Sequence, residues 1–252
     1  LIWLTATQLN VKTETAVVTR GDNSTAAFAP GDEVSILSWN VGYAGLGEES
    51  DFFMDGGKQT RAPSKAIVEK NMDGIVATVQ SMAADFTFLQ EIDAGPSTHA
   101  YGIEEAGRMR TETQLDSAHA LNYKCAFVPY PIPPIGRVNT GLMTLSTAPI
   151  ASAERIALPS PFKWPVSVAN LKRCLMPVYI DLEGTDAQLV LVNLHLEAYD
   201  DGEGKAAQTA ALTSFLEQEY AKGNYVIAGG DFNQTFPGGL DKYPIKNDDL
   251  WT

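Results

Sequence analysis

Hydrophobic and polar positions along the chain alternate between short apolar runs and segments with helical spacing. Residues 34–40 (VSILSWN) are apolar and β-rich, which predicts a buried strand. Residues 64–82 carry apolar side chains at helical spacing, and Ser64 is placed to cap that helix. Residues 86–90 (FTFLQ) predict a second buried strand. This order of strand, helix and strand favours a layered α/β protein.

The remaining chain continues the alternation. We expect helices over residues 104–121 and 205–222, and strands near residues 123–128, 141–146, 175–182, 188–194 and 225–229. The segment PYPIPPIGRVN, residues 129–139, is predicted to be a loop, because proline cannot donate to a central sheet ladder.

Length and composition favour one large domain. The chain has 252 residues, of which 44% are hydrophobic, and it contains no linker-like tract or internal repeat. We divide it into an N-terminal extension or first strand, residues 1–33, and a main domain, residues 34–252. The opening LIWLTATQ is either the end of a trimmed anchor or signal segment, or an ordinary first strand. The compartment therefore stays open between a membrane-anchored or extracytoplasmic protein and a cytoplasmic one.

Charge narrows the range of partners. Lysine and arginine total 18 against 31 aspartates and glutamates, a net charge of −13. An acidic protein repels polyanions, so tight sequence-independent DNA binding is disfavoured, whereas a small phosphorylated substrate and a divalent metal remain compatible. Cys125 and Cys174 lie in apolar runs, which favours free buried thiols, with one disulfide as the alternative.

Polar residues end four of the predicted strands. Asn40 and Glu91 follow the first two strands, His195 ends a later one, and the last strand runs into GGDFNQ with Asp231 and Asn233. Catalytic groups gather at strand ends, because the sheet holds them while the loops admit substrate. We therefore expect these side chains to share a site.

Each of these residue types suits phosphate chemistry. A carboxylate after a buried strand must be paired, protonated or metal-bound, and magnesium prefers oxygen ligands, so Glu91 is a candidate ligand. As an imidazolium, His195 is suited to bind a phosphate oxygen or protonate a leaving group, and Asn193 beside it is a further catalytic candidate. Asp231 is suited to orient a water, and Asn233 to stabilise developing charge. Taken singly, each also has an ordinary explanation as a cap, a turn residue or a core histidine.

The other two histidines, His99 and His119, lie in predicted loop or helix segments and are expected to be incidental. Three basic residues in or beside the long loops, Arg137, Lys172 and Arg173, are candidate phosphate binders, with surface solvation as the alternative for each. The long loop after Asn40 is expected to help shape the substrate pocket.

As an ordered set, these segments resemble the endonuclease/exonuclease/phosphatase superfamily, within it a bacterial subgroup of unassigned substrate. The matching segments are LSWN at 37–40, LQE at 89–91, TGLMTLS at 140–146, NLHL at 193–196 and GGDFN at 229–233. The resemblance implies a DNase I-like fold, a four-layer α/β/β/α sandwich of two mostly antiparallel sheets flanked by helices. It also implies hydrolysis of phosphate esters by in-line attack of water, dependent on Mg²⁺ or alternatively Mn²⁺.

The resemblance implies a catalytic or metal-binding role for five residues. Glu91 would be the main metal ligand, with Asn40 supporting the metal site. His195 would contact the scissile phosphate or the leaving group, Asp231 would activate the attacking water, and Asn233 would stabilise the transition state. A phosphodiesterase or phosphatase acting on a small phosphorylated molecule or a lipid headgroup is preferred, and a nuclease acting on DNA or RNA is the alternative. We expect a monomer without an obligate protein partner.

One family motif is absent from the sequence. The family pattern ends in Ser-Asp-His on a final strand, whereas this sequence stops at Trp251 and Thr252 without it. We expect a truncated catalytic domain, because the other motif residues are present. The alternative is a binding domain that has lost the terminal Asp-His.

Overall fold

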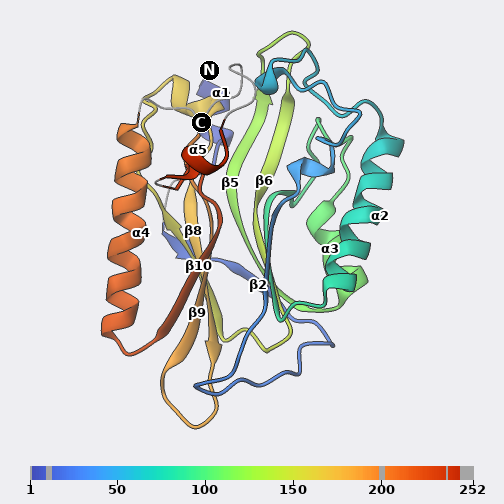
Figure 1. The fold of residues 1–252 in the computed structure, drawn as a ribbon. Helices are drawn as coiled ribbons and strands as arrows, with labels where there is room; N and C mark the ends of the chain where they lie inside the picture. Colours follow the sequence, from blue (N-terminus) through green and yellow to red (C-terminus); the bar gives the residue numbers. More distant parts are fainter. Residues whose placement is uncertain (1, 10–12, 199–201, 237, 245–252) are drawn as a thin grey trace.

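The computed structural model describes residues 2–9, 13–198, 202–236 and 238–244. Within these, ten strands form two five-stranded sheets that pack face to face, and helices cover the outer face of each sheet (Figure 1). The strands are β1 (Glu14–Thr15), β2 (Val17–Thr19), β3 (Ile36–Asn40), β4 (Phe86–Asp93), β5 (Asp116–Val128), β6 (Gly136–Ser146), β7 (Ser152–Ala157), β8 (Cys174–Asp181), β9 (Gln188–His195) and β10 (Tyr225–Asp231). The helices are α1 (Ile2–Thr7), α2 (Lys65–Met82), α3 (Glu105–Thr113), α4 (Glu203–Ala221) and α5 (Gly239–Lys242).

The layers follow the order helix, sheet, sheet, helix. One sheet has the order β2-β5-β6-β4-β3 and is covered by α2 and α3, and the other has the order β1-β7-β8-β9-β10 and is covered by α4 (Figure 1). Only the β3–β4 and β9–β10 pairs are parallel among the described strands, and α2 and α4 are the crossovers that such pairs require. The fold is therefore the four-layer α/β/β/α sandwich with mostly antiparallel sheets that the family resemblance implied.

Three apolar layers hold the sandwich together. Side chains such as Phe88 and Met176 fill the space between the two sheets. Met72 and Leu89 belong to the layer under α2 and α3, and Leu194 and Leu212 belong to the layer under α4. Burying this apolar surface removes it from water, which is the main favourable contribution to folding.

The first described residues tie the two sheets together. β1 pairs with β7 in one sheet, and β2, which follows two residues later, pairs with β5 in the other. Within the opening segment LIWLTATQ, Ile2–Thr7 form the short helix α1, so the interpretation of this segment as a first strand was wrong. No helix in the described part of the chain is long and apolar enough to cross a membrane.

Two other predictions needed correction. The helix expected over residues 104–121 ends at Thr113, where Gln114 takes a left-handed conformation, and β5 begins at Asp116. Pairing with β6 overrides the helix propensity of the alanines and leucine in this stretch. β6 begins at Gly136, so the last four residues of the predicted proline-rich loop belong to a strand. Cys125 and Cys174 are buried and free, as expected.

Candidate active site

The carboxyl ends of the two parallel strand pairs meet at one end of the sandwich. His195 Nε2 lies 3.8 Å from Glu91 Oε1 and 3.6 Å from Asp231 Oδ2. Asn40 Nδ2 donates a hydrogen bond of 2.9 Å to Asp231 Oδ2. Four side chains from four different strands therefore converge, and all of them line a cleft of about 710 Å³.

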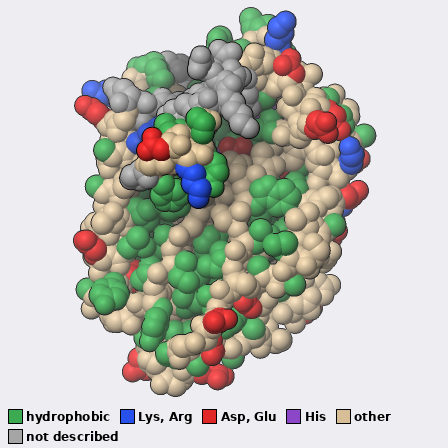
Figure 2. Space-filling view, viewed as in Figure 1, with side chains coloured by type: hydrophobic (Ala, Val, Ile, Leu, Met, Phe, Trp, Pro, Cys, Tyr) green, Lys and Arg blue, Asp and Glu red, His purple; other side chains and the backbone are tan. Residues whose placement is uncertain are grey.

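The cleft opens near the top of the face drawn in the figures. Figure 2 shows acidic side chains recessed in a hollow there, above a face on which apolar side chains gather. The loop after Asn40 supplies part of its wall, including Tyr43, Leu46, Phe52 and Met54, as predicted for this insertion.

A β-bulge presents Glu91 to the cleft. The pairing of β4 with β6 shifts register between Gln90 and Ile92, so Glu91 has no partner in the ladder, and its φ is 54°. Bulges of this kind re-aim one side chain out of the regular alternation. Burial raises the pKa of the Glu91 carboxyl, and a hydrogen bond from Asn40 and the charge of Arg173 offset part of that rise.

His195 ends β9 with its side chain almost fully buried. Burial lowers the pKa of its imidazole well below the ordinary value, and the positive charge of Arg173 lowers it further. The imidazole is therefore neutral near pH 7, whereas the sequence analysis considered it as an imidazolium. Nε2 faces the two carboxylates, and Nδ1 has no hydrogen-bond partner among the described residues.

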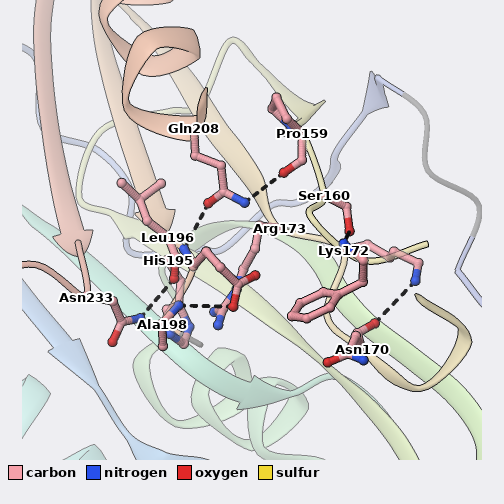
Figure 3. A network of polar contacts seen from close by, with 12 residues as sticks. Pro159, Ser160, Asn170, Lys172, Arg173, His195, Leu196, Ala198, Gln208 and Asn233 are labelled. Carbon is pink, nitrogen blue, oxygen red and sulfur yellow. Dashed lines mark hydrogen bonds and ion pairs between the residues drawn. The ribbon is translucent and has the colours of Figure 1, made fainter. Parts of the chain in front are cut away.

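Asp231 and Asn233 are fixed by the turn that follows β10. Asp231 Oδ1 accepts a 3.0 Å hydrogen bond from the backbone N–H of Asn233, whose φ is 49°. Asn233 Nδ2 donates to the carbonyl oxygen of Leu196 at 2.9 Å, in the strand-end segment beside His195 (Figure 3). The turn thus orients the carboxylate from one side while Asn40 orients it from the other.

Arg173 supplies a buried cation to the cleft. Its guanidinium is almost inaccessible to solvent, Nε lies 3.7 Å from Glu197 Oε2, and Nε and Nη1 make no hydrogen bond within the described structure. The backbone of Glu197, the residue whose carboxylate lies near Arg173, is in turn held by Gln208 on α4. Gln208 accepts from the backbone N–H of Glu197 at 2.9 Å and donates to the carbonyl of Pro159 at 2.8 Å (Figure 3). A buried guanidinium with open donors is suited to bind an anion that enters the cleft.

Three other predicted residues do not line this cleft. Arg137 lies exposed on β6. The Lys172 ammonium donates to the backbone carbonyl of Ser167 and to that of Asn170, of which Figure 3 shows the second. Asn193 is fully buried between the sheets. Its amide donates to the carbonyl oxygens of two strands of the facing sheet and accepts from Gln90 Nε2 at 2.8 Å, which makes it a structural link and not a part of the cleft.

The sequence did not reveal a cluster of three buried polar residues next to the cleft, namely His99, Asp93 and Glu105. His99, expected to be incidental, packs its ring 4.4 Å from the ring of Tyr43 and places Nε2 3.0 Å from Asp93 Oδ2. Glu105 Oε2 accepts from the backbone N–H of Asp93 at 3.0 Å. The acidic residue Asp93, two positions after Glu91 and close to the apolar run FTFL, was the available signal. His119, also called incidental, lies in strand β5 and outside this cleft.

The residues present fit a divalent cation that prefers oxygen ligands. No three His, Cys, Asp or Glu side chains in the described ranges are grouped so as to hold a metal ion by themselves. Magnesium, however, is usually bound through one or two carboxylates and keeps its remaining waters. Glu91 is a largely buried carboxylate aimed into a cleft with Asp231 nearby, and a cation there would offset the cost of burying it.

The fold and the site define a class of protein. It is the class of layered α/β proteins in which carboxylate and amide side chains group near the ends of strands. The sequence model of the Endonuclease/Exonuclease/phosphatase family matches residues 37–247. The chain therefore belongs to this family, whose members are typically hydrolases of phosphoesters. No curated protein matches it significantly in sequence.

Solved structures of the same fold are similar to this chain at low identity. An endonuclease/exonuclease/phosphatase from Beutenbergia cavernae is 18% identical with a TM-score of 0.54, over 81% of this chain and 48% of that one. TDP2 from Caenorhabditis elegans is 18% identical with a TM-score of 0.51, over 81% and 48% of the two chains. ANGEL2, a 2′,3′-cyclic phosphatase, is 15% identical with a TM-score of 0.55, over 91% and 59%. The chain thus spans about half the length of the first of these proteins, and the likeness shows the shared fold.

Proposed function

We propose that this protein is a Mg²⁺-dependent hydrolase of phosphate esters, a phosphodiesterase or a phosphatase. The observation that carries the proposal is the convergence of Glu91, His195 and Asp231, with His195 Nε2 3.8 and 3.6 Å from the two carboxylates. These side chains come from different strands of two sheets, so ordinary caps and turns do not account for their grouping.

Glu91, supported by Asn40, would hold the cation. When bound, Mg²⁺ supplies Lewis-acid neutralisation of phosphate charge, and Mn²⁺ is the alternative ion. Asn40 also donates to Asp231, so one amide links the ligand carboxylate to the second acidic group.

The protein's own groups position the reactants. Asp231 is fixed by Asn40 and by the backbone of Asn233, and we assign it to orient the attacking water. His195 Nε2 lies where it would hydrogen-bond a phosphoryl or leaving-group oxygen. Asn233 lines the cleft and would stabilise charge on the phosphoryl group, and Arg173 would bind a phosphate oxygen through its open donors.

A small phosphorylated molecule or a lipid headgroup is the preferred substrate. The net charge of −13 opposes long-range attraction of a polyanion, and Lys172 and Arg137 do not extend the cationic surface into the cleft. A structure of D. rerio TDP2 of the same fold contains a single-strand DNA product, so nucleic acid is the second candidate.

The experiment is a panel of phosphomonoesters, phosphodiesters and oligonucleotides with Mg²⁺, applied to the full-length natural protein. We expect hydrolysis of small esters and a loss of at least about 100-fold in Glu91→Gln, because the site loses its anionic ligand. Glu69→Gln, which changes an exposed carboxylate on α2, is the matched control and should retain activity. Full activity in Glu91→Gln would remove this residue from the site, and no turnover of any substrate by the parent would favour a binding domain.

A further inference from the structure

Three consecutive residues beside the cleft adopt left-handed backbone conformations. Gly42, Tyr43 and Ala44 have φ values of 53°, 54° and 49°. Glycine tolerates this region, but each other residue costs about 1–3 kcal/mol there and persists only where its surroundings determine it. Such strain gathers at functional sites, and Tyr43 lines the cleft that holds Glu91 and His195.

The surroundings of this turn hold it from both sides. Asn40 Oδ1 accepts from the backbone N–H of Gly42 at 3.0 Å, and Asn71 Nδ2 donates to the carbonyl of Ala44 at 2.9 Å. The Tyr43 ring packs against His99, with centroids 4.4 Å apart and planes inclined by 52°. The aromatic side chain is therefore held in place as well as the backbone.

His99 lies beside a fully buried carboxylate. Its Nε2 lies 3.0 Å from Asp93 Oδ2, and Glu105 accepts from the backbone N–H of Asp93 at 3.0 Å. Neither Asp93 nor Glu105 lines the cleft, so this pair does not contact substrate. A buried carboxylate is costly unless it is paired, and the group nearest to it here is an imidazole that packs against a residue of the cleft.

Resting on the proposed function, we infer that Tyr43 is a substrate-contacting residue whose hydroxyl donates to a phosphoryl oxygen, and that His99 and Asp93 are positioning residues which act through it. Tyr43 lines the same cleft as Glu91 and Arg173, so it lies beside the residues proposed to bind the metal and the phosphate. Burial raises the pKa of the phenol well above its ordinary value, so it stays a neutral donor.

The experiment measures kcat and KM for 4-nitrophenyl phosphate and bis(4-nitrophenyl) phosphate with Mg²⁺. Tyr43→Phe keeps the ring on His99 and removes only the hydroxyl. We expect kcat to fall about tenfold with KM within about twofold, because the donor acts on an oxygen that gains charge during the reaction. Tyr101→Phe is the matched control. Tyr101 also has a positive φ, 55°, and bonds the Ala62 carbonyl at 2.9 Å, but it lies outside the cleft, so its kinetics should not change.

A double-mutant cycle tests the positioning role. His99→Gln should lower kcat roughly three- to tenfold in the parent, and by less than about twofold in the Tyr43→Phe background, because coupled residues are non-additive. If His99→Gln does not fold, Asp93→Asn replaces it in the same cycle. An undiminished effect in the Tyr43→Phe background would overturn the positioning role.

Two further outcomes separate this inference from the proposed function. Unchanged kinetics in Tyr43→Phe, together with a large loss in Glu91→Gln, would overturn the role of Tyr43 alone. If the parent turns over neither ester, calorimetry with inorganic phosphate and Mg²⁺ is the second readout, and Tyr43→Phe should weaken binding about fivefold. A parent that neither binds phosphate nor hydrolyses any substrate of the panel would overturn both.

Discussion

Each sheet of this protein ends in a parallel β-α-β unit, and the two units build their halves of the site differently. In β9-α4-β10 the strands stop together, and Asp231 lies opposite His195 in register. In β3-α2-β4 the paired residues at the strand end are Asn40 and Gln90. Glu91 comes one residue later, in a bulge, and its strand continues to Asp93.

The two units differ in which residues adopt the unfavourable backbone conformations with positive φ. The unit ending in Asp231 uses Gly230, whose φ is 139° and whose absent Cβ would lie 2.1 Å from the Leu194 carbonyl oxygen. The other unit places Glu91, Tyr43 and Ala44, all with side chains, at positive φ. Regular pairing, a glycine and the turn at Asn233 therefore position the histidine and aspartate, whereas a bulge held by neighbouring contacts positions the glutamate.

Replacing the glycine should have the largest effect on stability. We expect Gly230→Ala to reduce the free energy of unfolding by about 3 kcal/mol, because the new methyl meets backbone and the φ is unfavourable. Gly229→Ala, one position earlier, is the control. Its Cβ would meet only the Phe88 ring at 3.2 Å, so a smaller loss is expected. Denaturant unfolding checks both, and equal losses would show that the backbone of Gly230 is not specially constrained.

Removing the imidazole should separate catalysis from stability. His195→Ala is expected to lower kcat about 100-fold, or about 2.7 kcal/mol in activation free energy, while the unfolding free energy falls by less. The measurement is turnover of the best substrate of the panel beside thermal unfolding. Losses of equal size in both quantities would instead indicate an ordinary core histidine.

A buried histidine away from the cleft should make stability depend on pH. Burial lowers the pKa of His119 from 6.5 to about 4, and Arg110 adds to this. The unfolded chain therefore binds a proton that the folded chain does not, so stability is fully present above pH 6.5 and is lost as the pH falls towards 4. We expect this group to remove about 2 kcal/mol between pH 7.5 and 5. His119→Gln should flatten that slope in denaturant titrations, and an unchanged slope would assign it to other groups.

The two crossover helices should differ in their dependence on a cap. Ser64 Oγ accepts from the backbone N–H of Ile67 at 3.3 Å at the start of α2, whereas α4 begins after Gly202 with no side-chain cap. Ser64→Ala should cost about 1 kcal/mol of unfolding free energy. Ser81→Ala, at an exposed position near the end of α2, should cost less, and a loss as large as that of Ser64→Ala would show that the cap is not the cause.

Several features of the fold could be predicted because they depend on local pattern. The strand ending at Asn40, the helix capped by Ser64 and the last strand before Asp231 are all marked by apolar periodicity and turn residues. The stretch from Asp116 to Leu121 was assigned to a helix because alanine and leucine favour helices locally. Its place between β2 and β6 in a sheet depends on strands far away in the chain.

The residue types of the site could be predicted from the sequence, but the directions in which their side chains point could not. That His195 and Asp231 end strands follows from sequence. Glu91 was also expected to end its strand, but it lies in a bulge of β4, which continues to Asp93. The bulge that turns Glu91 outward depends on the register between β4 and β6, which no local pattern specifies. Sequence also did not distinguish Asn193, which is buried between the sheets, from His195, which lies two positions later on the same face of β9 and lines the cleft.

The sequence by itself determined most of the segments that become strands and helices and which polar residues stand at or near their ends, because both depend largely on side chains a few positions apart. Only the tertiary structure decided that Arg173, Tyr43 and His99 gather around those ends, since their contacts join segments dozens of residues apart. The packing of two sheets against each other brings such groups together. Because water has little access to them there, their charges and hydrogen bonds interact more strongly than they would in solvent.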